Sequence, residues 1–390
     1  MTIQRFFVVV AGLILFLAPS AQARLEVPSP SGITARNYLL MDAFSGAVLT
    51  ENDADERVEP ASLTKIMTAY IVFRELQSQK LTLDEAVPVS EHAWRTGMTG
   101  ASRMYIDVNS QVRLEDLIRG MVVQSGNDAC VALAERISGT EAAFVDLMNA
   151  QAQAMGLTNT RFQNSHGLPS DQPQFTSARD IVTLAKNLIR RFPEYYGYYS
   201  ERSFTFNGIT QHNRNLLLGR EPSVDGVKTG WTSAAGYNLV TSAKRDEMRL
   251  VAVVMGITAD SRQKGGLARA DQSQALLNWG FRQYETHMVQ EPDKTLAEPR
   301  IWNGAQKRLP IGVGEPFHVT IPRGSRESLR LEINLIGHIE APVSAGQAVG
   351  ELLAWVGDDP VGSHPLVALQ AISRGGLFRR SLDSVLRMFY

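Results

Sequence analysis

The sequence predicts an α/β fold of the α+β kind: an antiparallel sheet with a helical region inserted in its middle, followed by a small all-β domain. Two observations carry this prediction. Short β-type stretches lie on either side of a long section with helical periodicity, and Gly, Pro and Val punctuate further short strands after Pro299. A chain of 390 residues, 44% of them hydrophobic, is long enough to bury a large core and to form two or three domains.

The first strands are predicted before the helical section. Residues 38–42 alternate, Ser45-Gly46 is a turn signal, and residues 47–49 are apolar, which together predict an antiparallel hairpin. Gly139 and Gly156 stand where helices are expected to end. Apolar residues at helical spacing predict helices over 61–76, 114–124, 128–137 and 141–155.

The second half of this region returns to strands. Ser177 and Asp180 have the spacing of a capping box and predict the start of another helix. A closing helix is predicted over 267–281. Between the two, short segments rich in β-branched or apolar residues predict strands at 225–229, 237–243 and 249–255.

The composition changes near 285–299, and this change divides the chain. We expect one large domain over 24–284 and a small β-sandwich domain over 285–370. Short strands are predicted in the latter at 317–321, 329–333 and 349–356. The β domain carries no motif, and its position suggests a spacer.

The first 23 residues have the pattern of a cleaved export signal. Arg5 gives a positive start, residues 6–17 form an apolar run, and Ala21-Gln22-Ala23 supplies the small residues of a cleavage site. The alternative is a transmembrane anchor. The apolar run is shorter than the roughly 20 residues that span a bilayer, so we expect cleavage after Ala23 and an exported protein.

The last stretch, 371–390, predicts an amphipathic helix. Its apolar residues share one helical face, and its charged residues lie opposite. Such a helix is too short and too charged to span a bilayer but can lie in the interface, so we expect attachment to a membrane surface; the alternative is a helix docked on the β domain. The apolar residues are Phe378, Leu382, Val385, Leu386 and Phe389, opposite Arg379, Arg380, Asp383 and Arg387.

Charge and cysteine content exclude several classes of protein. The net charge is −1, from 39 basic and 40 acidic residues without long runs of one sign, so no nucleic-acid partner is expected. The single cysteine, Cys130, cannot form an internal disulfide, and its apolar neighbours predict a buried thiol instead of a nucleophile. Neither Cys-x-x-Cys nor His-Glu-x-x-His occurs, so we expect no metal and no cofactor.

Three short motifs occur in order and carry the chemistry. They are Ser62-Leu63-Thr64-Lys65, Ser125-Gly126-Asn127 and Lys228-Thr229-Gly230. Residues three apart on a helix share a face, so Lys65 can reach the hydroxyl of Ser62 and accept its proton. A free lysine is almost wholly charged at neutral pH. We therefore expect burial, together with the cation of Lys228, to lower the pKa of Lys65.

The other motif residues fit roles around this pair. Lys228 and the hydroxyl of Thr229 are expected to hold a substrate carboxylate, while Gly230 lets a substrate backbone approach the strand. Ser125 is expected to relay a proton to the leaving amine. The backbone N–H groups of Ser62 and Trp231 are the predicted oxyanion donors.

With these motifs the chain resembles the low-molecular-mass penicillin-binding proteins, which are serine D-alanyl-D-alanine carboxypeptidases and share a fold with class A β-lactamases. The resemblance implies a serine transpeptidase/β-lactamase-like catalytic domain with Ser62 as acylated nucleophile, Lys65 as proton acceptor, and Ser125 and Asn127 lining the cleft. It also implies that Arg214 and Arg269 help to hold the terminal carboxylate. The segments that carry the resemblance are 60–68, 125–130, 177–180, 213–215, 225–230 and 236–239.

Two positions depart from the pattern of that family. Trp231 follows the Lys-Thr-Gly motif where relatives carry histidine, and Ala234-Ala235 replaces a Gly-rich turn. Either change leaves the backbone N–H in place. We expect them to affect substrate preference. His166 is a further candidate to line the site, but we favour a structural hydrogen bond in a loop.

The resemblance implies hydrolysis of the terminal D-Ala-D-Ala bond of peptidoglycan stem pentapeptides and covalent binding of β-lactam antibiotics. It implies a periplasmic location, with the terminal helix on the outer face of the inner membrane. A DD-endopeptidase or transpeptidase carries the same motifs and stays open. A β-lactamase is disfavoured because no Glu-x-x-x-Asn segment lies between the second and third motifs, and the intact motifs disfavour a non-catalytic binding protein.

Overall fold

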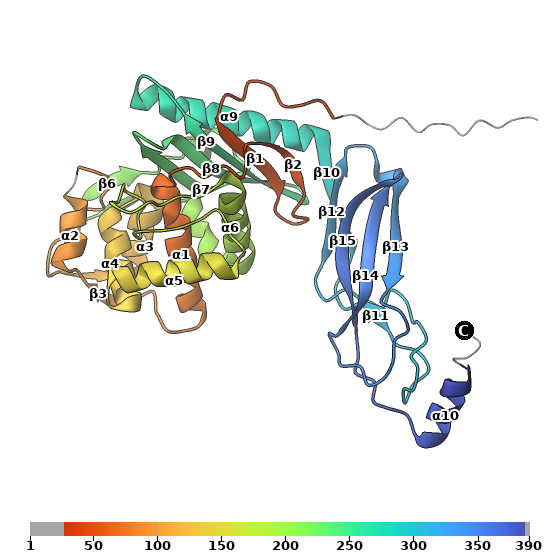
Figure 1. Cartoon of the computed structure of the whole chain (residues 1–390). Helices are drawn as coiled ribbons and strands as arrows, with labels where there is room; N and C mark the ends of the chain where they lie inside the picture. Colours follow the sequence, from red (N-terminus) through yellow and green to blue (C-terminus); the bar gives the residue numbers. More distant parts are fainter. Residues whose placement is uncertain (1–26, 99, 387–390) are drawn as a thin grey trace, which may run out of the picture.

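The computed structural model describes residues 27–98 and 100–386, which form two bodies with a helix at the far end (Figure 1). The predicted export signal at 1–23 lies outside the described residues. The first body contains the three motifs. The second is built from β-strands.

A five-stranded antiparallel sheet organises the first body, in the order β2-β1-β9-β8-β7. The first strands of the chain pair directly with strands about 200 residues later, for example Leu40 with Ala252. This pairing confirms that the helical region is inserted into the sheet. The strands are β1 (Asn37–Asp42), β2 (Val48–Asn52), β7 (Val224–Thr232), β8 (Gly236–Arg245) and β9 (Met248–Ile257).

Both faces of this sheet are covered, so neighbouring residues of one strand enter different cores. Leu39 packs among the inserted helices, whereas Leu40 packs under α9 (Arg262–Gln283), which crosses the opposite face in Figure 1. Strands buried on both faces lose the polar and apolar alternation of a half-exposed sheet. The inserted helices are α1 (Lys65–Gln77), α2 (Glu91–Gly97), α3 (Leu114–Arg119), α4 (Asn127–Ser138), α5 (Glu141–Ala154), α6 (Ala178–Arg191), α7 (Pro193–Tyr196) and α8 (Leu217–Arg220).

Two predicted helices are interrupted where they meet the site. The helix predicted over 61–76 begins as a 3₁₀ turn, η1 (Ala61–Thr64), before α1. The helix predicted over 114–124 changes to a wider π turn, η2 (Gly120–Gln124), after α3. The predicted helix start is confirmed, because the Ser177 side chain accepts a hydrogen bond from Asp180 N at 3.2 Å. The Asp180 carboxylate does not complete a capping box but accepts from Asn159 N and the Thr160 hydroxyl.

Several elements were not predicted, because they are short or broken by Pro and Gly. Two small hairpins border the helices, and β15 contains Pro360, Gly362 and Pro365, which indicate a loop when read alone. α9 also begins five residues before its predicted start, with Ser261 as its N-cap. The hairpins are β3 (Ala86–Pro88) with β4 (Gln111–Arg113), and β5 (Ser203–Phe206) with β6 (Ile209–His212); the 3₁₀ turn η3 (Gly197–Ser200) precedes β5.

The second body consists of two small sheets with one apolar core between them. One sheet pairs β10 with β12, and the other has the order β11-β15-β14-β13. Side chains such as Val319 and Leu352 from the two sheets meet in this core. The strands are β10 (Tyr284–Gln290), β11 (Ile311–Gly312), β12 (Phe317–Pro322), β13 (Leu329–Leu335), β14 (Ala348–Val356) and β15 (Asp359–Ala368); the 3₁₀ turn η4 (Arg326–Ser328) precedes β13.

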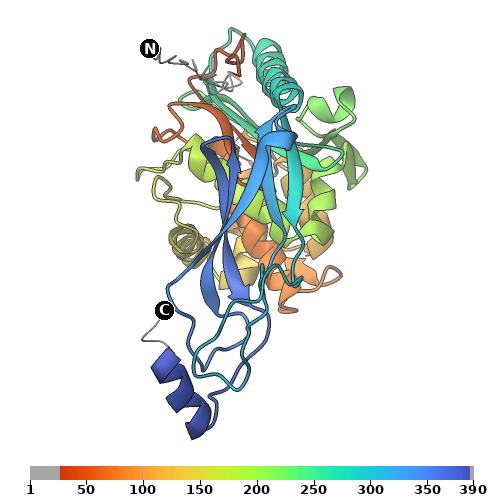
Figure 2. The ribbon, with the colours of Figure 1, turned by 90° about the vertical axis from the view of Figure 1, so that its right-hand side faces the viewer.

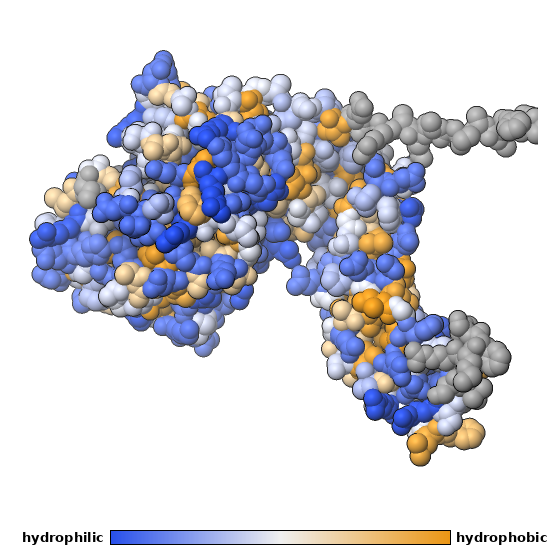
Figure 3. Space-filling view, in the orientation of Figure 1, coloured by the Kyte–Doolittle hydropathy of each residue, from blue (hydrophilic) through white to orange (hydrophobic). Residues whose placement is uncertain are grey.

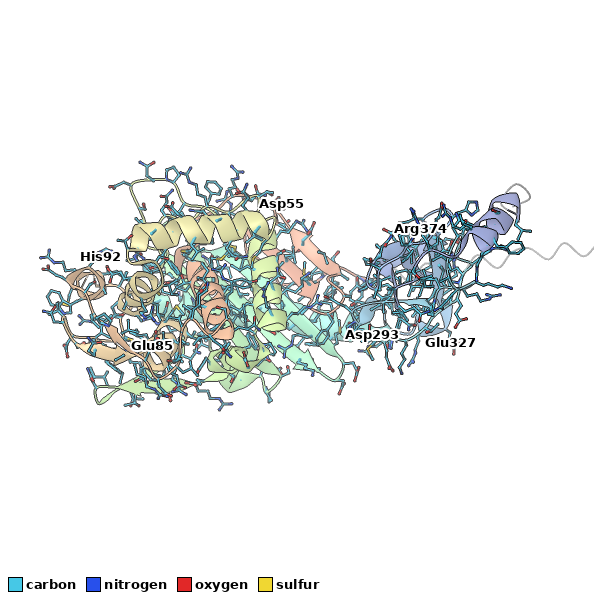
Figure 4. All side chains as sticks on the ribbon, turned by 90° about the horizontal axis from the view of Figure 1, so that it is seen from below. Asp55, Glu85, His92, Asp293, Glu327 and Arg374 are labelled. Carbon is cyan, nitrogen blue, oxygen red and sulfur yellow. The ribbon has the colours of Figure 1, made fainter. Side chains whose placement is uncertain are left out.

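Hydroxyl groups join the two bodies. Ser45 and Thr320 are 2.6 Å apart, Thr320 and Thr286 are 2.9 Å apart, and the Thr286 hydroxyl donates to Asp42 at 2.9 Å. Phe44 stacks on His318 beside them. In Figure 2 the β domain lies in front of the first body. In Figure 4, Arg374 lies in the β domain toward the terminal helix.

Two charged side chains fasten the terminal helix α10 (Leu377–Leu386) to the β domain: Asp383, and Arg379, which donates to the Ala305 carbonyl at 3.0 Å. Asp383, only 6% exposed, accepts from Arg300 at 2.8 Å and from Asn303 N at 2.9 Å. The sequence pattern placed Asp383 opposite the apolar residues but did not predict this contact with the β domain. Leu377 and Phe378 are 80% and 88% exposed. Figure 3 shows apolar atoms at the lower end of the molecule, where α10 lies in Figure 1. Arg387 and Phe389 lie outside the described residues.

No helix among the described residues is long and apolar enough to cross a bilayer.

Candidate active site

The nucleophile candidate sits in the 3₁₀ turn that leads into α1. A 3₁₀ turn has three residues per turn, so side chains three apart eclipse each other. This places Lys65 Nζ 2.9 Å from the hydroxyl of Ser62. Lys65 is buried, with 1% of its surface exposed, whereas Ser62 borders a cleft.

Lys65 is held by two further oxygen atoms from other elements. Its Nζ donates to Asn127 Oδ1 at 2.8 Å, at the start of α4, and to the backbone carbonyl of His166 at 2.7 Å. A neutral amine has two hydrogens and one lone pair. With both hydrogens directed at Asn127 and His166, the lone pair is directed at Ser62, as a general base requires.

Burial lowers the pKa of Lys65 from 10.5 to about 8, and the nearby guanidinium of Arg214 adds to this effect. At pH 7 this shift raises the neutral fraction of the amine roughly 300-fold. The expected lowering is present. Burial first, and then Lys65 and Arg214, lowers the pKa of Lys228 well below its usual value, so the repulsion between the two lysines disfavours a charge on both at once.

The second motif forms a strained turn between η2 and α4. Ser125 has φ 67° and ψ 33°, a left-handed conformation that L-residues seldom adopt. Within the described chain, the buried Oγ of Ser125 and Nδ2 of Asn127 have no hydrogen-bond partner. Buried polar groups are almost always paired, so these two atoms are available to a substrate.

The third motif lies on β7, which is the edge strand of the sheet. One face of this strand packs on η1: a side chain at Gly230 would come within 3.4 Å of Leu63 and Ala61. Lys228 is 3% exposed, and its Nζ donates to the Thr229 carbonyl at 3.2 Å. An edge strand next to a nucleophile has backbone groups available to an extended peptide.

These three elements enclose a cleft of about 550 Å³, which is lined by several cationic side chains. No acidic side chain is among its lining residues, whereas three arginines are, Arg214, Arg262 and Arg269. Arg269 is anchored by the carbonyls of Gly230 and Asn238 at 3.3 and 3.4 Å. Such a cleft favours an anionic ligand. The remaining lining residues include Ser62, Ser125, Asn127, Thr229, Gly230, Trp231 and Tyr237.

The structure therefore brings together every residue that the sequence indicated as a site residue. Lys65 and Lys228 lie beneath the cleft, and the others line it. Trp231, 42% exposed, packs beside Tyr237 and under the guanidinium of Arg262. Arg262 was not predicted, because it has no motif around it.

A loop that the motifs do not include supports Lys65 from behind. Glu141, the first residue of α5, accepts from Ser165 N at 2.9 Å and from Ser165 Oγ at 2.7 Å. The next residue supplies the carbonyl that holds Lys65. Exposed His92 contacts the other oxygen of Glu141 at 2.8 Å, at the outer end of the first body in Figure 4. Sequence reasoning missed Glu141, because a glutamate at a helix start is a common capping residue.

His166 has a structural role in this loop through both its ring and its backbone. Its Nδ1 accepts from Leu168 N at 3.2 Å, and the ring does not line the cleft. Burial lowers the pKa of His166 to about 4, so the ring is neutral at physiological pH. Gly167 follows with φ 85°, and a side chain there would come 1.7 Å from the Ala61 carbonyl.

A serine hydroxyl aimed at a buried lysine, beside a cationic cleft and an edge strand, defines a serine acyl-transfer enzyme. Within the described residues no group of His, Cys, Asp and Glu is arranged to hold a metal ion. Comparison with known proteins identifies the family.

The family profile described as D-alanyl-D-alanine carboxypeptidase matches residues 24–259, and that of the penicillin-binding protein 5 C-terminal domain matches 284–374. The chain is 43% identical over 386 residues to D-alanyl-D-alanine carboxypeptidase DacC of Escherichia coli K12, covering 97% of this chain and 94% of that protein. Penicillin-binding protein 5 of Haemophilus influenzae superposes with a TM-score of 0.83 at 40% identity, covering 89% of this chain and all of that one.

A more distant structure, penicillin-binding protein D2 of Listeria monocytogenes in its ampicillin-bound form, gives a TM-score of 0.58 at 28% identity. It covers 65% of this chain and all of that one. The chain belongs to the D-alanyl-D-alanine carboxypeptidase family. Its activity is that of a serine-type D-Ala-D-Ala carboxypeptidase.

Proposed function

We propose that this carboxypeptidase acts on peptidoglycan stem pentapeptides and releases their terminal D-alanine through an ester on Ser62. The observation that carries the assignment is the position of Lys65 Nζ, within 2.9 Å of Ser62 Oγ and fixed by Asn127 and His166. No other described serine next to the cleft has a lysine at this distance.

The reaction begins when Lys65 takes the proton of Ser62 and Ser62 Oγ attacks the carbonyl of the penultimate D-alanine. The developing oxyanion lies between the N–H groups of Ser62 and Trp231. The C–N bond then breaks, and Ser125 relays the proton held by Lys65 to the leaving amine, which returns Lys65 to its neutral form. Water activated by Lys65 finally hydrolyses the ester and releases the shortened peptide.

Lys228 binds the terminal carboxylate of the substrate together with Thr229, Arg214 and Arg269. An anion beside a buried lysine favours its charged form. Substrate binding therefore reverses the lowering of the Lys228 pKa and draws a proton to that residue. The charge on Lys228 is thus coupled to the presence of the carboxylate.

A matched pair of serine variants tests this assignment. The wild-type protein, incubated with a muramyl pentapeptide, is expected to release one D-alanine, seen as the loss of one alanine unit in mass. Ser62→Ala should abolish the release, whereas Ser170→Ala, in an exposed loop, should retain it. Retained turnover in Ser62→Ala would rule out Ser62 as the nucleophile.

β-Lactams are proposed to acylate the same serine, because they carry a carboxylate and a reactive amide like the peptide. The ampicillin-bound form of the Listeria relative supports this. Intact-protein mass after exposure to ampicillin should rise by one drug molecule, and Ser62→Ala should show no rise. Rapid loss of the adduct with turnover of the drug would instead favour a β-lactamase.

The proposed location is the periplasm, with α10 resting on the outer face of the inner membrane and the β domain as spacer. The support is the pattern of residues 1–23 and the exposure of Leu377 and Phe378 next to Arg379 and Arg380 on α10. Vesicles with anionic lipid should float the mature chain, and Leu377→Glu with Phe378→Glu should abolish flotation. Leu331→Glu, at another exposed leucine, is the control.

A further inference from the structure

The cleft continues into a second pocket that the proposed reaction does not use. This pocket has a volume of about 410 Å³ and shares Gly100, Ala101, Ser102 and Arg214 with the cleft. Its remaining walls include Arg103, Tyr105 and Gln124. Two pockets with a common wall of four residues form one continuous binding surface for a ligand larger than either.

The shared residues place the second pocket on the leaving-group side of the reaction. Gln124 directly precedes Ser125, the proposed proton donor to the leaving amine, and Arg214 is among the cations proposed to hold the terminal carboxylate. By contrast, Leu168 and Trp231 line only the first cleft. A group in the second pocket is therefore attached to the residue that leaves, and not to the acyl part that stays on Ser62.

The pocket contains an arginine without an acidic partner. Arg103 is half-buried, its guanidinium lies 4.4 Å from the centre of the Tyr105 ring, and it contacts Met98 Sδ at 3.2 Å. Its backbone carbonyl is fixed by Gln211 Nε2 at 3.1 Å, on β6. Within the described parts of the chain Arg103 forms no ion pair, and no acidic residue lines this pocket.

This arrangement differs from that of the arginines nearby on the surface. Arg95 on α2 is paired with Glu91 at 2.6 Å, and Arg113 on β4 is paired with Asp84 at 2.6 Å. A guanidinium on an aromatic face is oriented in advance, so it loses little freedom when it binds a carboxylate. D-Alanine carries only one carboxylate, which the cations around Thr229 already bind in the proposed mechanism.

We propose that Arg103 and its pocket form a subsite for a leaving residue with a second carboxylate, so that the enzyme accepts D-amino acids with an acidic side chain after the scissile bond. This inference rests on the proposed Ser62 mechanism. The bond changes are those of the D-alanine reaction: the Ser62 ester forms, the C–N bond breaks, and the leaving amine receives the proton. Only the leaving residue differs.

Two substrates that differ in one ionisable group test the subsite. They are diacetyl-L-Lys-D-Ala-D-Glu and diacetyl-L-Lys-D-Ala-D-Gln, which have nearly the same shape. At low salt the wild-type kcat/KM ratio of D-Glu over D-Gln should be about tenfold, as expected for one charge-assisted hydrogen bond. The ratio should fall with added salt, because the pocket is open to solvent.

Arg103→Gln should bring the ratio close to 1, and Arg103→Lys should restore part of it. Arg95→Gln, which removes a nearby arginine outside the pocket, should keep the wild-type ratio. Rates are divided by the fraction of protein that ampicillin labels, which corrects for any misfolded variant. Because each variant is its own reference, a general loss of rate leaves the ratio unchanged.

A wild-type ratio near 1 overturns the subsite, and so does a ratio that survives Arg103→Gln, since the preference would then come from Arg214 or Arg262. Diacetyl-L-Lys-D-Ala-D-Ala separates this failure from failure of the mechanism. Turnover of that peptide that depends on Ser62, without a D-Glu preference, rejects the subsite alone. Turnover that persists in Ser62→Ala rejects the proposed mechanism itself.

Discussion

β7 and β13 are both edge strands of antiparallel sheets, but their surroundings differ completely. Seven of the nine residues of β7 are buried, because β8, η1 and η3 pack against this strand. β13 has no buried residue, and its apolar Leu331 and Ile333 are 39% and 38% exposed. An exposed edge can pair with strands of other chains unless charges prevent it.

The difference shows what converts a strand edge into a selective site. β7 is open only inside a cleft that has a nucleophile and cations around it, so an extended peptide with a terminal carboxylate can reach it. β13 instead carries Arg330 and Glu332, which pair at 3.2 Å on the exposed strand. At β7 the surrounding cleft makes the strand edge selective for its ligand. At β13 the charged side chains protect the edge from pairing with other chains.

The largest effect is expected from a substitution that displaces η1, which packs on β7. In Gly167→Ala the new Cβ would collide with the Ala61 carbonyl at 1.7 Å and would require φ 85°. Displacement of η1 by about 1 Å should reduce acylation by ampicillin at least about 100-fold. Gly156→Ala is the control: it has φ 72° but no atom within 4 Å. Equal losses in both variants would attribute the effect to backbone strain and not to η1.

The next largest effect is expected at Glu141, because it holds the loop whose His166 carbonyl binds Lys65. Glu141→Ala removes both bonds to Ser165 and frees the His166 carbonyl from its position at Lys65, so kcat should fall about tenfold with little change in KM. Glu141→Gln keeps an oxygen that accepts from Ser165 and should restore most of the rate. If Gln were as poor as Ala, the charge and not the position would be what Glu141 contributes.

The pH dependence should reveal the buried lysine. The pKa of Lys65 is lowered to about 8, and the neutral amine is the form that accepts a proton. Log kcat/KM for ampicillin acylation should therefore rise by about one unit per pH unit below pH 8 and level off above it. A rate that is flat between pH 6 and pH 8 would contradict a neutral Lys65 as the base.

The smallest effect on catalysis is expected at β13. Arg330→Val with Glu332→Val removes the charges from the edge and should increase self-association in sedimentation measurements. The carboxypeptidase rate per molecule should stay within about twofold, because no residue of the site contacts β13. An unchanged sedimentation profile would mean that the charges do not protect this edge.

The sequence was sufficient to predict the site residues that lie in recognisable motifs. Ser62, Ser125 and Lys228 lie in local patterns that carry their own chemistry, and the apolar strands and helices around them predict one sheet with an inserted helical region. The three motifs come together because β1 pairs with β9, which joins the two ends of the inserted helical region in one sheet. The β domain was predicted from a change in composition and from short strands between Gly and Pro residues, although β10, β11 and β15 were missed.

What was not predicted depends on contacts between distant segments. Glu141 and Arg103 have ordinary sequence neighbours, and only the fold places Glu141 behind Lys65 and Arg103 beside the cleft. The π turn at 120–124 has apolar periodicity compatible with a regular helix, so its widening before Ser125 was not evident. The docking of Asp383 was missed because its partner, Arg300, lies 83 residues away.

The hydroxyl network of Ser45, Thr286, Thr320 and Asp42 has a mechanical consequence. A chain of short hydrogen bonds next to a stacked Phe44 and His318 resists bending between the two bodies more than a single peptide linker would. The distance from the cleft to the tip of α10 is therefore nearly constant in every copy. With the proposed attachment of α10 to a membrane, the cleft would reach the polymer at one height, and strands at other depths would stay untrimmed.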